Sequence, residues 1–197
     1  MKKIFIFSSI MLLLLFTGCT TNNGPSKKVE EFMGKYQSMD SDVLAQLDNV
    51  VSSDSSMSDE QKKNYKALME KQYQNMSYKI KNEEVNGDNA TVDVEIEVYD
   101  YASSVAKSKK YYEEHKEEFA DDAKKNSSDE KDNDSNLIKD AIETSSKYID
   151  YKIKELQNVS DKIKYTITFN LHKEDNEWVL DDISDVDRKK LHGLYEE

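Results

Sequence analysis

The sequence has few of the residues on which several large classes of protein depend. Its 197 residues include one Cys, one Pro, five Gly, one Trp and three His. A single Cys excludes a disulfide framework within the chain and a Cys-rich zinc site, because both need several sulfur atoms at matched spacing. Five scattered Gly residues exclude phosphate-binding glycine loops and dinucleotide fingerprints. Acidic residues outnumber basic ones by 40 to 28, which argues against a general nucleic-acid binder.

The length suits one ordinary domain. Hydrophobic residues make up 37% of the chain and charged residues 35%, with a formal net charge of −12. Some of the apolar residues lie in the first 16 positions, so the rest of the chain is more polar than this average and supports a modest core.

The first 19 residues have the layout of a bacterial export signal. Lys2 and Lys3 precede a mostly apolar run at residues 4–16, which is shorter than the ~20 residues that a membrane-spanning helix needs. Residues 15–19, LFTGC, resemble the lipobox of bacterial lipoproteins, although Phe16 stands where Leu is common. In that motif small residues precede a Cys whose sulfur receives diacylglycerol before cleavage.

The resemblance implies that Cys19 is lipidated, that residues 1–18 are a signal peptide and that residues 19–26 form a flexible linker. Two acyl chains, each stabilised by ~0.8 kcal/mol per buried methylene, anchor a protein without a transmembrane segment. We therefore expect the protein on the outer face of the cytoplasmic membrane. The alternatives are an ordinary secretory signal with an incidental Cys and an uncleaved anchor.

Residues 27–197 are expected to form a single α+β domain that opens with three amphipathic helices. The first follows Ser26, with apolar residues at helical spacing, and a second short helix starts at Asp40 or Ser41. Ser58 begins the third, because Ser58 and Gln61 form a capping-box pattern.

Two hairpins follow from a change of the hydrophobic period to two. Residues 77–85 and 90–98 flank the turn signal of residues 86–88, and residues 163–171 precede a turn at 173–176 and a strand at 178–183. These patterns predict a curved antiparallel sheet of about four strands, packed on one side by the N-terminal helices.

The segment between the hairpins, residues 102–158, is predicted to be a helical insertion. Residues 121–136 are almost wholly polar or charged and predict a mobile loop or a frayed helix end, and a firmer helix runs from 138 to 156. A short helix is expected at 185–192.

Three segments resemble the nuclear transport factor 2-like (cystatin-like) superfamily, especially small lipoproteins of Gram-positive bacteria. They are KVEEF at 28–32, VNGDNATV at 85–92 and WVL at 178–180, and the resemblance covers residues 27–101 and 160–183. The insertion departs from the family plan. Some enzymes of that superfamily use Asp, His and Tyr in a cone between sheet and helices, so the resemblance implies where a pocket would lie.

The histidines and the strands give no catalytic arrangement. His115, His172 and His192 are each expected on the surface, because none lies near a carboxylate and a nucleophile at a recognisable spacing. The core-facing residues of both long strands are aliphatic or aromatic. The sequence therefore predicts no enzyme activity and no bound cofactor.

One stretch has the spacing of a calcium-binding loop. Its candidate ligands occupy loop positions 1, 3, 5, 9 and 12, namely Asp132, Asp134, Asn136, Asp140 and Glu143. Leu137 stands where such a loop needs Gly, so an acidic helix start is the favoured interpretation.

A candidate contact surface lies on the outer face of the strand at 90–98. Glu95, Glu97, Tyr99 and Tyr101 are expected on one side, as an acidic band that ends in paired aromatic rings. The alternative is that the tyrosines pack against the insertion helices.

Taken with the anchor, these patterns favour a membrane-tethered, non-catalytic module that binds an envelope protein or peptide. One alternative is a small-ligand carrier or enzyme that uses the cone of the fold. It would be excluded if core side chains fill the space between helices and sheet. The other alternative is a structural spacer or assembly component.

Overall fold

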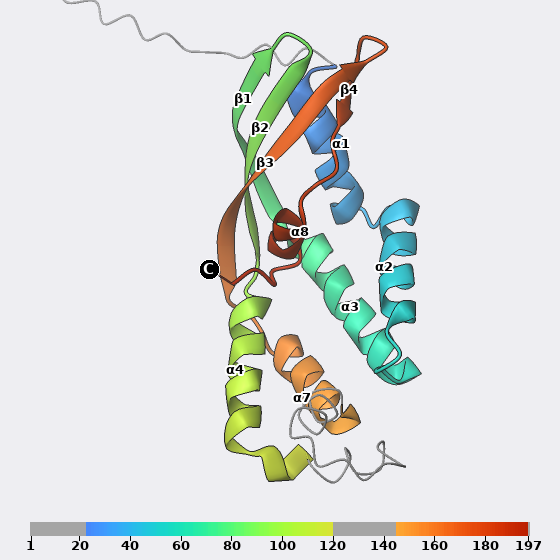
Figure 1. Cartoon of the computed structure of the whole chain (residues 1–197), viewed down its shortest axis with the longest axis vertical. Helices are drawn as coiled ribbons and strands as arrows, with labels where there is room; N and C mark the ends of the chain where they lie inside the picture. The colour runs from blue at the N-terminus through green and yellow to red at the C-terminus, as the bar shows by residue number, and fades with distance from the viewer. Residues whose placement is uncertain (1–22, 120–144, 197) are drawn as a thin grey trace, which may run out of the picture.

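The computed structural model describes residues 23–119 and 145–196. Figure 1 shows an elongated molecule with a twisted sheet at one end and a pair of helices at the other. A long central helix, α3 (Asp59–Asn75), runs from the sheet toward the helical pair, and the short C-terminal helix α8 (Asp185–Leu191) lies beside it.

The three N-terminal helices are α1 (Pro25–Gln37), α2 (Ser41–Ser53) and α3 (Asp59–Asn75). The predicted start of the second helix and the predicted capping box of the third are confirmed. Asp40 accepts a hydrogen bond from the backbone N–H of Asp42, and Ser58 and Gln61 form a reciprocal capping box.

The first helix begins earlier than we expected. Its N-cap is Gly24, so Pro25 and Ser26 belong to the helix and not to the linker. Proline favours this first helical position because its fixed φ suits the helix and its missing N–H is not needed there. Ser26 is buried, and its backbone N–H donates to the carboxylate of Glu83 on β1, at 2.9 Å.

The four strands are β1 (Ser77–Asn86), β2 (Asn89–Tyr99), β3 (Lys162–Glu174) and β4 (Glu177–Leu180). They pair antiparallel in the order β1-β2-β3-β4, so both predicted hairpins and the α+β class are confirmed. The register of β1 shifts between Ile80 and Asn82, and such an irregularity bends and twists a strand.

The hairpin turns use residues that tolerate a positive φ. Gly87 has φ +62° in the first turn, and Asp175 and Asn176 have φ +50° and +66° in the second. Gly, Asn and Asp are the residues that adopt this region most readily.

The core lies between one face of the sheet and helices α1 and α3. Alternate residues of β2 and β3 point into it and are at most 5% exposed: Ala90, Val92, Val94, Ile96, Val98, Tyr165, Ile167, Phe169 and Leu171. The side chains between them lie on the polar outer face, which gives the half-buried pattern expected of an antiparallel sheet.

The insertion contributes α4 (Tyr101–Glu114) and α7 (Ser146–Gln157), which pack side by side (Figure 1). Their far ends share a separate aromatic cluster that contains Tyr111, Tyr112, Phe119, Tyr148 and Tyr151. The predicted loop at 121–136 and the start of the helix at 138–144 lie outside the described residues.

Two buried glutamines join the parts of the fold. The Gln61 side-chain amide donates to the backbone oxygen and the hydroxyl of Ser146 and to the Asp150 carboxylate, which fixes α3 to α7. The Gln72 side chain bonds to both the backbone N–H and the C=O of Tyr99, at 2.9 and 3.2 Å. α3 therefore fixes the start of the insertion and the end of β2.

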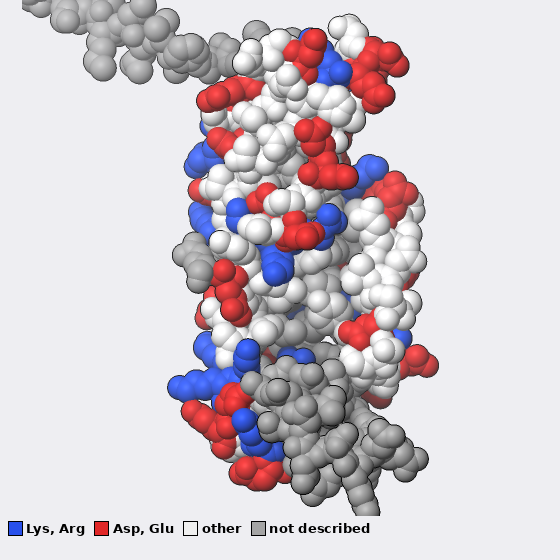
Figure 2. All heavy atoms as spheres, viewed as in Figure 1, with Lys and Arg blue, Asp and Glu red and all other residues white. Residues whose placement is uncertain are grey.

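Charge is spread over the surface. Figure 2 shows acidic and basic side chains interspersed over the visible face, while the surface over α2 is mostly uncharged.

Within residues 23–119 and 145–196, no helix has the length and apolar character needed to cross a bilayer.

Candidate functional site

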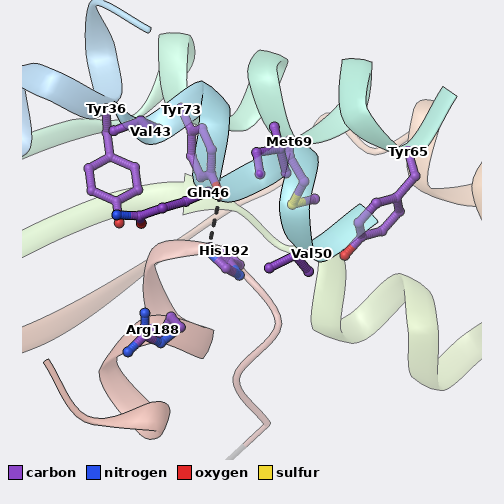
Figure 3. A pocket seen from close by; sticks show the side chains of 10 residues that line it. Tyr36, Val43, Gln46, Val50, Tyr65, Met69, Tyr73, Arg188 and His192 are labelled. Atoms are coloured by element: carbon purple, nitrogen blue, oxygen red, sulfur yellow. Dashed lines mark hydrogen bonds between the residues drawn. The ribbon is translucent and has the colours of Figure 1, made fainter. Parts of the chain in front are cut away.

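A small groove lies where α2, α3 and the C-terminal helix α8 (Asp185–Leu191) meet (Figure 3). It has a volume of about 90 Å³, and ten residues line it: Tyr36, Val43, Gln46, Leu47, Val50, Tyr65, Met69, Tyr73, Arg188 and His192. Val43, Leu47 and Met69 are buried, whereas Val50 is 66% exposed. The groove therefore runs from an apolar floor to a mouth in solvent.

Helical spacing gathers the lining side chains from distant parts of the chain. Val43, Leu47 and Val50 share one face of α2, and Tyr65, Met69 and Tyr73 share one face of α3. Arg188 and His192 are four residues apart at the end of the chain, so they too lie on one side.

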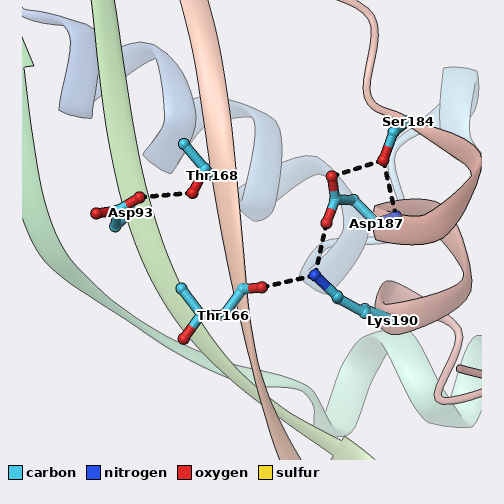
Figure 4. Close-up of polar contacts among 6 residues, drawn as sticks. All are labelled: Asp93, Thr166, Thr168, Ser184, Asp187 and Lys190. Carbon is cyan, nitrogen blue, oxygen red and sulfur yellow. Dashed lines mark hydrogen bonds and ion pairs between the residues drawn. The ribbon is translucent and has the colours of Figure 1, made fainter. Parts of the chain in front are cut away.

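Contacts on the opposite side of α8 set its position. The Lys190 ammonium donates to the backbone oxygen of Thr166 on β3 and to the Asp187 carboxylate, both at 2.9 Å (Figure 4). Ser184 caps the helix by accepting from the N–H of Asp187, and its hydroxyl donates to the Asp187 side chain. These bonds direct Arg188 and His192 toward α2 and α3.

The end of α8 is fixed by a close backbone contact. Gly193 has φ +69°, and its backbone oxygen accepts from the N–H of Ala102 at 2.7 Å. A Cβ on Gly193 would collide with the backbone oxygen of Tyr99 and the side-chain amide of Gln72. Only glycine allows both this conformation and this approach.

A neutral hydrogen bond lies on the floor of the groove. The Tyr73 hydroxyl and Nε2 of His192 are 3.1 Å apart. Burial, helped by the nearby Arg188 charge, lowers the pKa of His192 to about 4, and burial raises the pKa of Tyr73. Both side chains are uncharged at pH 7, so the floor accepts apolar groups.

The guanidinium of Arg188 supplies the charge at the groove. Nη2 donates to the backbone oxygen of Ile183 at 3.3 Å, and Nε lies 3.9 Å from a carboxylate oxygen of Asp185 that is almost fully exposed. These partners leave most of the five guanidinium N–H donors available. None of the ten described lining residues is Asp or Glu, so Arg188 makes the mouth locally positive on an acidic protein.

The space that the family resemblance marks as a pocket is filled by side chains. Met33, Tyr36, Tyr73, Ile96 and Phe169 are each at most 7% exposed between the helices and the sheet. Trp178 packs against the same core and is partly buried. Tyr36 and Tyr73 also line the α8 groove, which therefore lies next to the filled cone.

The three histidines have different surroundings and different hydrogen-bond partners. Nδ1 of His115 lies 2.9 Å from the backbone oxygen of Tyr111, and Nδ1 of half-exposed His172 lies 2.6 Å from the Asp181 carboxylate. The expectation of a surface position holds only in part for His192, which is partly buried and whose Nε2 lies 3.1 Å from the Tyr73 hydroxyl on α3. Among residues 23–119 and 145–196, no group of His, Cys, Asp and Glu side chains has the arrangement of a metal site.

The predicted contact surface is only partly assembled. Glu95, Glu97 and Tyr99 lie on the outer face of β2, but Tyr101 is fully buried and its hydroxyl donates to the backbone oxygen of Leu68. The alternation of inner and outer side chains along β2 stops before Tyr101, because the chain enters α4 after Asp100 and Tyr101 turns inward. The inclusion of Tyr101 in an exposed surface is therefore wrong.

Lysines also neutralise the acidic band. Lys81 and Lys164 each lie 3.5 Å from a carboxylate oxygen of Glu95, and they hold the pKa of this exposed carboxyl below its usual value. The ammonium groups of Lys71 and Lys162 lie over the Tyr99 ring, 4.9 and 5.3 Å from its centroid. This face is a mixed-charge sheet surface.

Two predicted sites lie outside the described residues. They are the lipidation site Cys19 and the calcium-like set Asp132, Asp134, Asn136, Asp140 and Glu143. Sequence reasoning missed the groove, whose clearest signal was that Arg188 is the single arginine among 28 basic residues.

Comparison with known proteins gives one structural similarity. The crystal structure of the putative lipoprotein YcdA from Bacillus subtilis matches with a TM-score of 0.39 and 18% sequence identity, over 90% of this chain and 49% of that chain. The chain thus spans about half the length of the protein it matches. No protein-family model and no curated protein matches it. Similarity at this level identifies neither fold nor function, and the nuclear transport factor 2-like resemblance stays a prediction.

Proposed function

We propose that this chain is a lipoprotein, anchored through diacylglycerol on Cys19 to the outer face of the cytoplasmic membrane. Its α+β domain acts as a non-catalytic module that binds an envelope protein or peptide. The export signal and the lipobox-like residues 15–19 support the anchor, because the only Cys of the chain stands at the acceptor position.

The groove at α8 is the observation that carries the binding role. It combines buried apolar side chains with one arginine, and the imidazole of His192 bonds to a tyrosine rather than to a carboxylate and a nucleophile. Such a lining suits recognition, since an apolar floor gives affinity and a few polar groups give orientation. Filling of the sheet and helix interface by core side chains disfavours a carrier or enzyme that uses the cone.

Incorporation of an alkyne-labelled fatty acid in a Gram-positive host tests the anchor. The full chain and a Thr20→Ser control should become labelled and fractionate with membranes, whereas Cys19→Ser should not become labelled. Labelling of Cys19→Ser would contradict the proposal.

Photo-crosslinking in the same cells tests the binding role. A photoreactive residue in place of Gln46, at the groove mouth, should give a discrete adduct with one partner. The same residue in place of exposed Asn82 on β1 should give none. Equal adducts at both positions, or none at either, would count against a binding role for the groove.

A further inference from the structure

The α8 groove combines three properties: a small volume, an uncharged floor and one cation at its mouth. We propose that it receives a single aliphatic side chain of a partner peptide, while Arg188 binds a carboxylate on the adjacent residue of that peptide. This inference rests on the proposed binding role and adds the chemistry of the partner.

The volume limits what can enter. Pockets for whole small-molecule ligands measure ~300 to 1,000 Å³, and a cavity that holds benzene measures ~150 Å³. The groove measures about 90 Å³, which is room for one side chain of the size of Val or Leu. A protein partner that inserts one anchor residue fits this volume, as in interfaces where a few buried side chains supply most of the binding energy.

The floor favours an aliphatic anchor. Val43, Leu47 and Met69 are at most 6% exposed and present carbon and sulfur atoms. The polar atoms of Tyr73 and His192 already bond to each other, so an apolar group can enter without breaking a bond to either side chain. An inserted side chain would also cover Val50, the most exposed of the large hydrophobic residues described.

The mouth favours a carboxylate. Arg188 lies at the groove, none of whose ten described lining residues is acidic, and its Nε lies 3.9 Å from a carboxylate oxygen of exposed Asp185. A guanidinium binds a carboxylate through two parallel hydrogen bonds, whereas it repels an ammonium group. The charge of Arg188 therefore favours an acidic residue of the partner at the mouth of the groove.

A matched pair of blocked dipeptides tests the proposal. The mature, lipidated protein is labelled with ¹³C-methyl Met and held in nanodiscs. It is titrated with N-acetyl-Leu-Asp-amide and with N-acetyl-Leu-Asn-amide. The methyl signal of Met69 in the groove should shift with both, and the Asp peptide should bind at least fivefold more tightly. Met33, buried in the core, should not shift and reports that the fold is intact.

Two substitutions on α8 assign the selectivity to one side chain. Arg188→Gln should reduce the preference for the Asp peptide to less than twofold, whereas Lys189→Gln, which removes the same charge one residue away and outside the groove, should preserve it. An equal loss in both variants would mean that long-range charge, and not Arg188, sets the preference, and it would overturn the inference.

A third probe separates a peptide from a free acid. 4-Methylpentanoate carries the leucine side chain and a carboxylate without a peptide backbone, and it should bind at least fivefold more weakly than the Asp dipeptide. Equal binding would overturn the peptide assignment. If the Met69 signal responds to none of the probes while crosslinking at Gln46 still succeeds, the proposed function stands and this inference is wrong.

Discussion

The hydroxyl of Tyr73 and Nε2 of His192 lie 3.1 Å apart across 119 positions of sequence. This bond joins the central helix α3 to the residue that follows the C-terminal helix α8. It also places an uncharged imidazole between Tyr73 and Arg188, so the C-terminal segment completes both the floor and the mouth of the groove (Figure 3).

The free energy of unfolding should depend on pH through His192. Burial lowers the pKa of this imidazole to about 4 in the folded protein, against ~6.5 in the unfolded chain. As the pH falls from 6.5 to 4, the unfolded chain takes up a proton that the folded protein refuses, so stability decreases over that window by on the order of 2 to 3 kcal/mol.

Urea unfolding at several pH values between 7.5 and 4 measures this slope. His192→Asn should lose most of this pH dependence of stability. Tyr73→Phe should keep most of it, because burial of the imidazole is the main cause of the lowered pKa of His192. Identical slopes in the wild type and His192→Asn would show that His192 titrates normally.

Gly193→Ala should destabilise the protein by at least ~2 kcal/mol, because the new methyl group meets backbone and the φ of +69° is unfavourable for Ala. Gly34→Ala is the matched control. Gly34 lies inside α1 with open space around it, so the same substitution should stabilise the protein by ~0.5 to 1 kcal/mol. Chemical denaturation compares the two, and effects of the same sign would contradict this interpretation.

Lys190→Met should loosen α8. The Lys190 side chain is 19% exposed, and its ammonium donates to the backbone oxygen of Thr166 on β3 and to Asp187, so its loss should cost ~1 to 2 kcal/mol (Figure 4). Exposed Lys189 has no such contact to the sheet, and Lys189→Met should change stability by less than ~0.5 kcal/mol.

Amide hydrogen exchange locates the effect of Lys190→Met. Protection should fall in residues 185–193 and along the β3 edge near Thr166, while α1 keeps its protection. A uniform loss of protection across the molecule would show that Lys190 acts on global stability instead of on the docking of α8.

Local patterns in the sequence predicted most of the fold. The capping box at Ser58, the alternation along residues 90–98 and the turn residues at 86–88 each act over a few positions, so their signals are complete in the sequence. Tyr101 shows where this reasoning fails. The prediction extended the outer face of the strand to Tyr101, but the alternation ends at Asp100, a charged residue on a core-facing position that caps α4.

The groove could not be predicted in the same way, because its parts come from four helices, α1, α2, α3 and α8, whose packing is set by tertiary contacts. The spacing of Arg188 and His192 indicates one helical face, yet which element that face meets depends on Lys190, Thr166 and the close approach at Gly193. Those contacts join residues more than 20 positions apart and leave no local pattern.

The mass of the N-terminal peptide of the mature protein tests the account most directly. We predict that a digest of the membrane fraction yields a peptide that begins at Cys19 and carries diacylglycerol on its sulfur. A free thiol at Cys19, or a peptide that still contains residues 1–18, would contradict the assignment of the protein as a lipid-anchored binding module.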